Sequence, residues 1–209
     1  MRFCCEQFSI TLEGKVLFAP LNFNAQGGEQ VCIMGPSGSG KSTLLSAIAG
    51  TIEPIFRCHG DLRLNNNSLI GQNLANRKVG MMFQEDLLFP HLNVAQNLAF
   101  ALPQGLCADQ RRDKINQALA AADMAGFNTR DVATLSGGQR SRISLLRTLL
   151  AEPKLLLLDE PFAKLDKPLR QSFRQFVLSH IQAAQIPAIL VSHDLSDAED
   201  CQVVELCIP

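Results

Sequence analysis

One segment of nine residues constrains the fold of this chain more than any other feature. It reads GPSGSGKST, residues 35–43, and it fits the pattern G-x-x-x-x-G-K-[ST] at every fixed position. The run before it, Gln30–Met34, is short, apolar and β-branched, which predicts a strand. The run after it, LLSAIAG, spaces its apolar residues as a helix does and ends at Gly50. A strand, a glycine-rich loop and a helix in this order predict a phosphate-binding loop (P-loop).

The residue types of this loop fit that chemistry. Glycines allow backbone N–H groups to turn inward around phosphates, and a helix that begins near Lys41 directs the positive end of its dipole toward them. The Lys41 ammonium can reach the β- and γ-phosphates of a nucleotide, and the Ser42 hydroxyl can bind Mg²⁺. A Gly/Ser-rich loop before a helix by chance is the simpler alternative, and the Lys-Ser pair and the preceding strand argue against it. The predicted nucleotide-binding residues are Gly35, Pro36, Ser37, Gly38, Ser39, Gly40, Lys41, Ser42 and Thr43.

Two carboxylates supply the second half of such a site. Asp159 follows the apolar strand-like run Leu155–Leu158, and Glu160 comes next. We expect Asp159 to hold magnesium through water. Because side chains alternate along a strand, we expect Glu160 to point elsewhere, toward an attacking water, as a general base. Solvated acids at a strand end are the alternative, which Pro161 disfavours because it fixes the turn that follows.

Composition limits the class of protein. The 209 residues carry 19 Lys and Arg against 20 Asp and Glu, which argues against binding nucleic acid through a basic surface. With 46% hydrophobic residues the chain is too apolar to be disordered. No apolar run approaches the roughly 18 residues that a membrane span needs, and Glu6 comes too early for a signal-peptide core. The 7 cysteines form no CxxC and no zinc-type cluster, so we expect reduced thiols in a cytoplasmic protein.

Strand-like and helix-like patterns alternate along the chain, which predicts an α/β fold with apolar, parallel-type strands and a helical insertion. The strand-like segments are residues 3–24, 30–34, 59–69, 79–83, 154–159 and 187–193, and the helix-like ones are 93–150 and 167–184.

A second glycine motif, Leu135-Ser136-Gly137-Gly138-Gln139, precedes a long helical pattern. Ser136 suits a helix N-cap and the glycines leave amides exposed, so this is another candidate anion-binding terminus. Since one P-loop needs one γ-phosphate cradle, we expect the second to serve another subunit's nucleotide. With LSGGQ about 95 residues after the P-loop and 20 before Asp159, the chain resembles the ATP-binding-cassette (ABC) family from about residue 8 to 204.

The resemblance implies a fold and further site residues. It implies one ABC domain over 1–209, a P-loop NTPase core with a mainly parallel sheet and an N-terminal antiparallel β portion. The core would span about 1–84 and 153–209, with a helical subdomain at about 85–152 and no C-terminal regulatory domain.

Three single residues match family positions. Gln84 corresponds to the glutamine that contacts Mg²⁺ and senses the γ-phosphate, and Asp166 to the aspartate that links two sites across a dimer. His193 corresponds to the histidine that hydrogen-bonds the γ-phosphate and helps position the water. Alone, His193 is more simply an ordinary histidine at a strand end, but it lies 34 residues after Asp159 and before Asp194, as in the family.

The subgroup indicated is a bacterial importer ATPase. Residues 83–102 look like the stretch that receives a coupling helix from the membrane subunit, and packing into a small core cluster is the alternative. Phe162, with Leu169-Arg170 downstream, is similar to importers for thiamine, ferric iron, sulfate or polyamines, whereas exporters usually have Thr there. The apolar tip expected to dock the partner is Leu87, Leu88, Phe89 and Pro90.

The chain departs from the family pattern at two places. The family stacks adenine on an aromatic side chain about two dozen residues before the P-loop, but residues 10–14 read ITLEG and the chain has no Tyr or Trp. Either Leu12 packs on the base, or Phe8 or Phe18 turns toward it. The tail after His193 also lacks a few residues usually found before the last strand.

The resemblance therefore implies an ATPase that uses ATP and Mg²⁺ in a head-to-tail homodimer and drives separate permease subunits. It would lie peripherally on the cytoplasmic face of the inner membrane, with a periplasmic or lipid-anchored binding protein as an indirect partner. An exporter ATPase is the main alternative, and a soluble ABC ATPase, a P-loop small-molecule kinase and a non-hydrolysing module fit less well. The transported substrate is not readable from the sequence.

Overall fold

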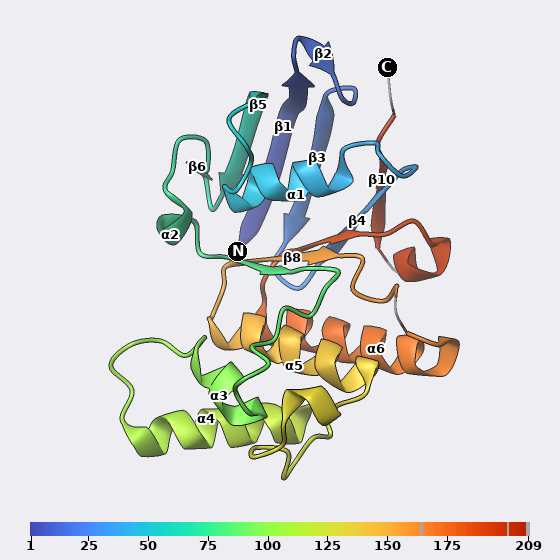
Figure 1. Ribbon diagram of the computed structural model, residues 1–209. Helices are drawn as coiled ribbons and strands as arrows, with labels where there is room; N and C mark the ends of the chain where they lie inside the picture. Colours follow the sequence, from blue (N-terminus) through green and yellow to red (C-terminus); the bar gives the residue numbers. More distant parts are fainter. Residues whose placement is uncertain (164, 200, 208–209) are drawn as a thin grey trace. The chain divides into compact units, whose positions relative to one another are not determined.

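The computed structural model describes residues 1–163, 165–199 and 201–207 (Figure 1). The chain divides into two compact units that alternate along the sequence. The first comprises Met1–Met81, Lys154–Glu160 and Leu178–Pro209, and the second comprises Met82–Pro153 and Pro161–Val177.

An antiparallel sheet is built around the long strand β1 of the first unit. β1 pairs with β2, β3 and β5, and β5 pairs with β6. The register shifts between Cys5 and Phe8, where Gln7 has φ +47°. This bulge interrupts the alternation of buried and exposed side chains along β1. The strands are β1 (Arg2–Leu12), β2 (Lys15–Val16), β3 (Leu21–Gln26), β5 (Phe56–Leu64) and β6 (Asn67–Ser68).

A second sheet has the order β10-β4-β9-β8-β7. β4 pairs in parallel with β10 and β9, and β9 pairs in parallel with β8. Every residue of β4 and β9 is buried, which is why these strands are continuous apolar runs. The predicted α/β fold with a mainly parallel sheet and an antiparallel N-terminal portion is confirmed. The strands are β4 (Gln30–Met34), β7 (Val79–Met82), β8 (Leu155–Asp159), β9 (Ala188–Val191) and β10 (Gln202–Glu205).

Helices complete both units. In the helix-like stretch expected from residue 93, α3 ends at Ala99, and the chain continues in turns in which the Ala101 and Leu102 amides donate to the Leu98 and Ala99 carbonyls. The helix expected over 167–184 is confirmed as α6. The helices are α1 (Lys41–Ala49), α2 (Leu74–Arg77), α3 (Val94–Ala99), α4 (Ala108–Ala121), η1 (Val132–Thr134), α5 (Gly137–Leu150), α6 (Lys167–Ala184) and η2 (Leu195–Ala198).

Each unit has an apolar core of its own. In the first unit, one cluster joins residues from β1, α1 and β8, including Phe3, Leu44 and Leu157. In the second, Leu98 of α3, Leu119 of α4 and Ile143 of α5 pack together. Among the described residues, no helix is both long enough and apolar enough to cross a membrane.

Candidate functional site

The predicted phosphate-binding loop connects the end of β4 to the start of α1 in the first unit. Gly40 is the N-cap of α1 and has φ +92°, in the left-handed region that favours glycine. A Cβ at Gly40 would also lie 3.1 Å from Cδ1 of Phe18, so a side chain there would be crowded as well as strained. Gly38 has φ +81° with nothing within 4 Å of a Cβ position, so only its conformation demands glycine.

Two buried polar side chains of this loop suit an anionic ligand. Lys41 is 7% exposed, and its Nζ donates to the carbonyl oxygens of Gly35 and Pro36 at 2.8 Å each. Ser39 is 1% exposed, and its Oγ has no hydrogen-bond partner among the described residues. A buried hydroxyl without a partner is unfavourable, and a phosphate oxygen is the kind of group that satisfies it.

Ser42 and Asp159 form an oxygen pair that fits magnesium. Ser42 Oγ donates to Asp159 Oδ1 at 3.4 Å, joining the start of α1 to the end of β8. Burial raises the pKa of Asp159, and the nearby Glu160 raises it further, while the Ser42 bond and the Lys41 charge lower it. A carboxylate and a hydroxyl are the hard oxygen ligands that Mg²⁺ prefers. These two residues therefore fit the predicted metal site.

Glu160 and His193 form a second pair at the ends of neighbouring strands. We expected the alternation of side chains along a strand to direct Asp159 and Glu160 to different places. Instead, β8 ends at Asp159, and Glu160 has φ +44°, so a turn of the backbone separates the two carboxylates. The Glu160 amide donates to the Val191 carbonyl at 3.0 Å. Glu160 Oε1 then lies 3.2 Å from His193 Nδ1. A carboxylate oriented by an imidazole can accept a proton from water.

A cavity of about 410 Å³ adjoins the start of the P-loop and His193. It is lined by Met34, Gly35, Pro36, His193, Leu195, Glu205 and Leu206, so it is bounded by residues of the candidate site and of the last strand.

A contact that the sequence did not reveal supports His193. Ser192 and Asp197 are each 2% exposed, and Ser192 Oγ donates to Asp197 Oδ2 at 2.6 Å. Ser192 Oγ also accepts from the Asp194 amide at 3.1 Å. The two residues that flank His193 in the sequence are therefore hydrogen-bonded to each other. The sequence signal that could have revealed this contact is Asp197, an acidic residue four positions after His193.

The LSGGQ segment lies in the second unit and begins α5. Ser136 is the N-cap: its Oγ accepts from the Gln139 amide at 3.3 Å, and its amide donates to Gln139 Oε1 at 3.0 Å. The predicted cap at Ser136 is confirmed. A Cβ at Gly138 would overlap Leu169, whereas Gly137 faces more open space. Ser136 is exposed at the helix start.

The remaining predicted residues lie in the second unit. Gln84 is exposed, three residues before the tip Leu87–Pro90. Asp166 Oδ1 accepts from the Leu169 amide at 3.0 Å at the start of α6. The structure thus brings the P-loop, Asp159, Glu160 and His193 together in the first unit, and the roles of Gln84, Asp166 and LSGGQ stay predictions.

The structure narrows the alternatives for adenine binding. Phe8 and Phe18 are both fully buried in the first unit's core, so neither offers a ring face to a base. Leu12 is partly exposed at the end of β1, and its hairpin neighbour Val16 is 45% exposed.

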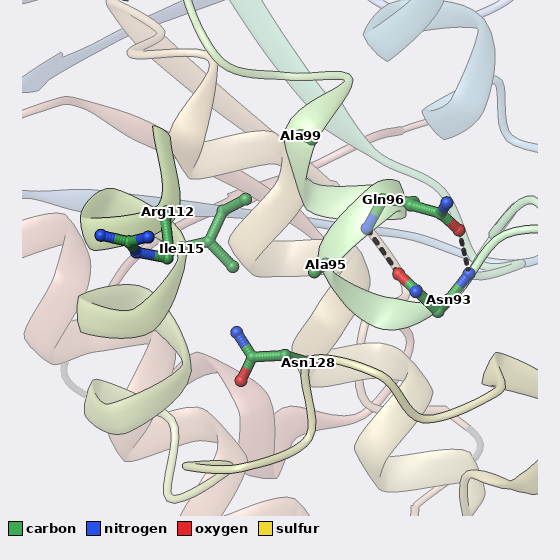
Figure 2. Close-up of a pocket in the computed structure, with 7 residues that line it drawn as sticks. All are labelled: Asn93, Ala95, Gln96, Ala99, Arg112, Ile115 and Asn128. Atoms are coloured by element: carbon green, nitrogen blue, oxygen red, sulfur yellow. Dashed lines mark hydrogen bonds between the residues drawn. The ribbon is translucent and has the colours of Figure 1, made fainter. Parts of the chain in front are cut away.

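A second cavity, of about 300 Å³, lies in the second unit between α3 and α4 (Figure 2). Its polar side chains already have partners: Asn93 and Gln96 bond each other, Arg112 pairs with Asp109, and Asn128 bonds Asn116. It contains none of the predicted site residues, and nothing in it calls for a ligand.

Comparison with known proteins agrees with this geometry. A family described as ABC transporter matches residues 18–163. An uncharacterised ABC transporter ATP-binding protein of Escherichia coli K12, YnjD, is 45% identical over 204 residues, covering 97% of this chain and 94% of the relative. The Fe(3+) ions import ATP-binding protein FbpC of Mannheimia succiniciproducens is 34% identical (90% of this chain, 53% of the relative). The sulfate/thiosulfate import ATP-binding protein CysA of Halalkalibacterium halodurans is 38% identical (87% and 52%).

The chain therefore spans about half the length of these two importer relatives. Among solved structures, it is similar to a dimeric, post-hydrolysis state of the ATP-binding cassette MJ0796 bound to ADP and Pi. The TM-score is 0.80 at 26% identity, covering 99% of this chain and 94% of the other. The family match covers more than half of the chain, and the chain accordingly belongs to the ABC transporter family, as an ATP-binding domain that hydrolyses ATP.

Proposed function

We propose that this chain is the motor subunit of a membrane importer and hydrolyses Mg-ATP in a head-to-tail homodimer. The observation that carries the hydrolytic part is the Glu160–His193 contact of 3.2 Å, in the same unit as the P-loop and the Ser42–Asp159 pair.

The first unit binds the triphosphate. Backbone amides of Gly38–Lys41 and the start of α1 face the phosphates, the Ser39 hydroxyl gains an acceptor, and Lys41 Nζ neutralises the β- and γ-phosphates. Ser42 and Asp159 would hold Mg²⁺, and the family resemblance implies Gln84 of the second unit as a further ligand. When bound, this ion would neutralise charge on the phosphate oxygens.

Glu160 is the general base and His193 orients it. Glu160 accepts a proton from the attacking water while the water oxygen bonds to the γ-phosphorus. The bond from that phosphorus to the β–γ bridging oxygen breaks, and the electron pair leaves with ADP. His193 keeps the Glu160 carboxylate toward the water and hydrogen-bonds the γ-phosphate. Positioning and charge neutralisation supply most of the rate enhancement in such a reaction.

A second copy completes the site. Its Ser136, with the amides of Gly137 and Gly138 at the start of α5, contacts the γ-phosphate, and its Asp166 links the two sites. Support comes from the exposed N-cap Ser136. It also comes from the dimeric state of the similar cassette, which holds ADP and Pi. Closure driven by ATP, followed by opening after hydrolysis, is the power stroke.

The importer assignment rests on the named activities of the iron and sulfate relatives. Phe162 is buried and packs edge-on against Phe173 of the same unit, with ring centroids 5.8 Å apart. The substrate of this importer is not assigned.

The permease partner docks on the tip after Gln84. Leu87 is 52% exposed, and Phe89 packs on Phe100, itself 68% exposed, at 4.9 Å between ring centroids. Leu88 instead packs against the second unit's core, as the alternative interpretation of the tip expected for a residue of this stretch. An apolar surface of this kind suits a helix of a membrane partner, at the cytoplasmic face of the membrane. A binding protein outside the membrane would deliver the substrate.

The test of the motor is Glu160→Gln. We expect this variant to bind Mg-ATP, to hydrolyse it at least about a hundredfold more slowly, and to dimerise only with ATP. Light scattering with and without ATP measures the dimer, and Glu53→Gln, a change at an exposed acid, is the control. A variant that stays monomeric with saturating ATP contradicts the dimer.

A second experiment tests the direction of transport. This chain, reconstituted in vesicles with the permease that co-purifies with it, should drive uptake of substrate. ATP-driven release of substrate would instead indicate an exporter.

A further inference from the structure

The segment that follows Gln84 is fastened to α5 by the side chain of Asp86. Asp86 Oδ1 accepts from Ser141 Oγ at 3.0 Å, and its Oδ2 lies 3.5 Å from Arg140 Nε. The Asp86 side chain is 14% exposed, and Ser141 is buried. A carboxylate this buried, with two partners on adjacent residues of one helix, is held in a single place.

Arg140 contacts both Asp86 and the start of the LSGGQ motif. Its Nη1 donates to the Leu135 carbonyl at 2.7 Å, while its Nε faces Asp86. One guanidinium therefore joins Asp86 to the residue immediately before Ser136. Because the guanidinium is planar and rigid, moving the Asp86 carboxylate changes the bond at Leu135 as well.

A second attachment holds the same segment further along α5. Arg147 donates from Nη1 to the Leu87 carbonyl at 2.9 Å and from Nη2 to the Asp86 carbonyl at 3.2 Å. Its guanidinium carbon also lies 5.6 Å from the ring centroid of Phe89. Burial lowers the pKa of Arg147 and the Asp86 charge opposes that shift. Leu87, with φ +46°, keeps a left-handed conformation between these contacts.

The two attachments do different things. The hydrogen bonds of Arg147 to this segment go to its backbone carbonyls, so they fix the path of the segment. Asp86 is linked through Arg140 to the helix end that carries Ser136. Asp86 also places a negative charge near the N-terminus of α5, where a phosphate is expected to bind, and Arg140 offsets that charge.

We propose that Asp86 is a positioning residue that, through Arg140 and Ser141, fixes the first turn of α5 so that Ser136 engages the nucleotide of a second copy. The inference rests on the proposed head-to-tail dimer. If Asp86 has this role, closure of the dimer depends on the position of the segment between Gln84 and the permease-docking tip.

The first measurement is dimerisation against ATP concentration in the Glu160→Gln background. Asp86→Ala should raise the ATP concentration for half-maximal dimerisation by about fivefold or more, in the range of coupling energies between sites. ADP affinity, which needs one copy only, should not change. Asp86→Asn keeps an acceptor for Ser141 and loses the charge opposite Arg140, so its shift should be smaller. Asp109→Ala, which breaks an exposed acid–Arg112 pair of the same unit, is the matched control and should shift nothing.

The second measurement separates a relay from a general loss of packing. Arg140→Ala should produce a shift like that of Asp86→Ala, and the double variant should shift little further, because both act through one contact. Independent, additive shifts would overturn the relay. So would unchanged dimerisation in folded Asp86→Ala and Arg140→Ala proteins. If Asp86→Ala fails to fold, Ser141→Ala, which removes one hydroxyl, takes its place.

The third measurement does not depend on the dimer. In nucleotide-free protein, hydrogen exchange in peptides covering residues 135–142 should be faster in Asp86→Ala than in Asp109→Ala. Unchanged exchange overturns the proposal whatever the oligomeric state. If Glu160→Gln with Asp86 intact never dimerises while exchange does respond, the proposed dimer fails and the positioning role of Asp86 stands.

Discussion

The two glycine-containing motifs of this chain are built in opposite ways. At the P-loop, charged and polar groups from several elements meet: buried Lys41, the Ser42–Asp159 pair and the Glu160–His193 pair. At LSGGQ, the cap is local, since the capping box joins Ser136 to Gln139, three residues later on the same helix. The first region can bind and hydrolyse, whereas the second can offer a helix terminus. On the proposed head-to-tail dimer, we therefore expect nucleotide affinity to depend on the first region alone and turnover on both.

The largest effect is expected at Lys41. Lys41→Ala removes the positive charge nearest the β- and γ-phosphates, so Mg-ATP affinity should fall by at least about a hundredfold. Calorimetric titration measures this, and Lys15→Ala, at an exposed position of β2, should bind normally. Normal ATP affinity in Lys41→Ala would break the assignment of the first region.

Ser136→Ala should separate the two regions. We expect turnover to fall by about one to two orders of magnitude while ADP affinity stays within about twofold, because the cap acts only across the dimer. Losing a cap also lowers stability by about 1 kcal/mol. Asn93→Ala removes a similar capping box from α3 and controls for that. A large loss of ADP affinity in Ser136→Ala would mean that LSGGQ serves its own copy's nucleotide.

The support behind His193 should be visible in stability. Asp197→Ala leaves the buried Ser192 hydroxyl without its acceptor, which should lower the free energy of unfolding by about 1–3 kcal/mol. Urea unfolding measures this loss. Asp197→Asn, which keeps the shape and an oxygen acceptor, should lose less. Equal stability of all three proteins would show that the bond does not hold this end of β9.

The smallest effect concerns thiol reactivity. Burial raises the pKa of Cys5 and of Cys32 to about 12, so at pH 8 neither forms much of the reactive thiolate. Cys107, in the second unit, is an exposed free thiol. Iodoacetamide followed by peptide mass mapping should modify Cys107 in the folded protein, and Cys5 and Cys32 only after denaturation. Labelling of Cys32 in the native state would mean that β4 opens readily.

Local patterns predicted most of the fold. β4, α6 and the cap at Ser136 were predictable because their signals lie within a few residues: apolar runs, helical spacing and cap chemistry. The turn at Glu160 was not, because only the neighbouring strand holds its left-handed backbone, through the Val191 carbonyl.

Contacts between distant residues account for what the sequence could not predict. Asp86 meets Ser141 across 55 positions, and no spacing rule relates them. The ring of Phe162 packs edge-on against Phe173, a contact between residues 11 positions apart that the sequence did not reveal. The residue types of a phosphate site are recognisable from sequence because the loop is contiguous, whereas the residues that orient it depend on how the sheet and helices pack.

The most direct test of the account mixes two impaired variants. In a head-to-tail dimer, a Lys41→Ala copy and a Ser136→Ala copy form one site with both defects and one intact site. We predict that mixing them restores ATPase activity, to about a quarter of wild type if copies pair at random and sites act independently. A Lys41→Ala, Ser136→Ala double variant mixed with the Lys41→Ala variant has no intact site in any dimer and is the control. Mixed dimers of the two single variants that form but show no gain in activity would contradict the account.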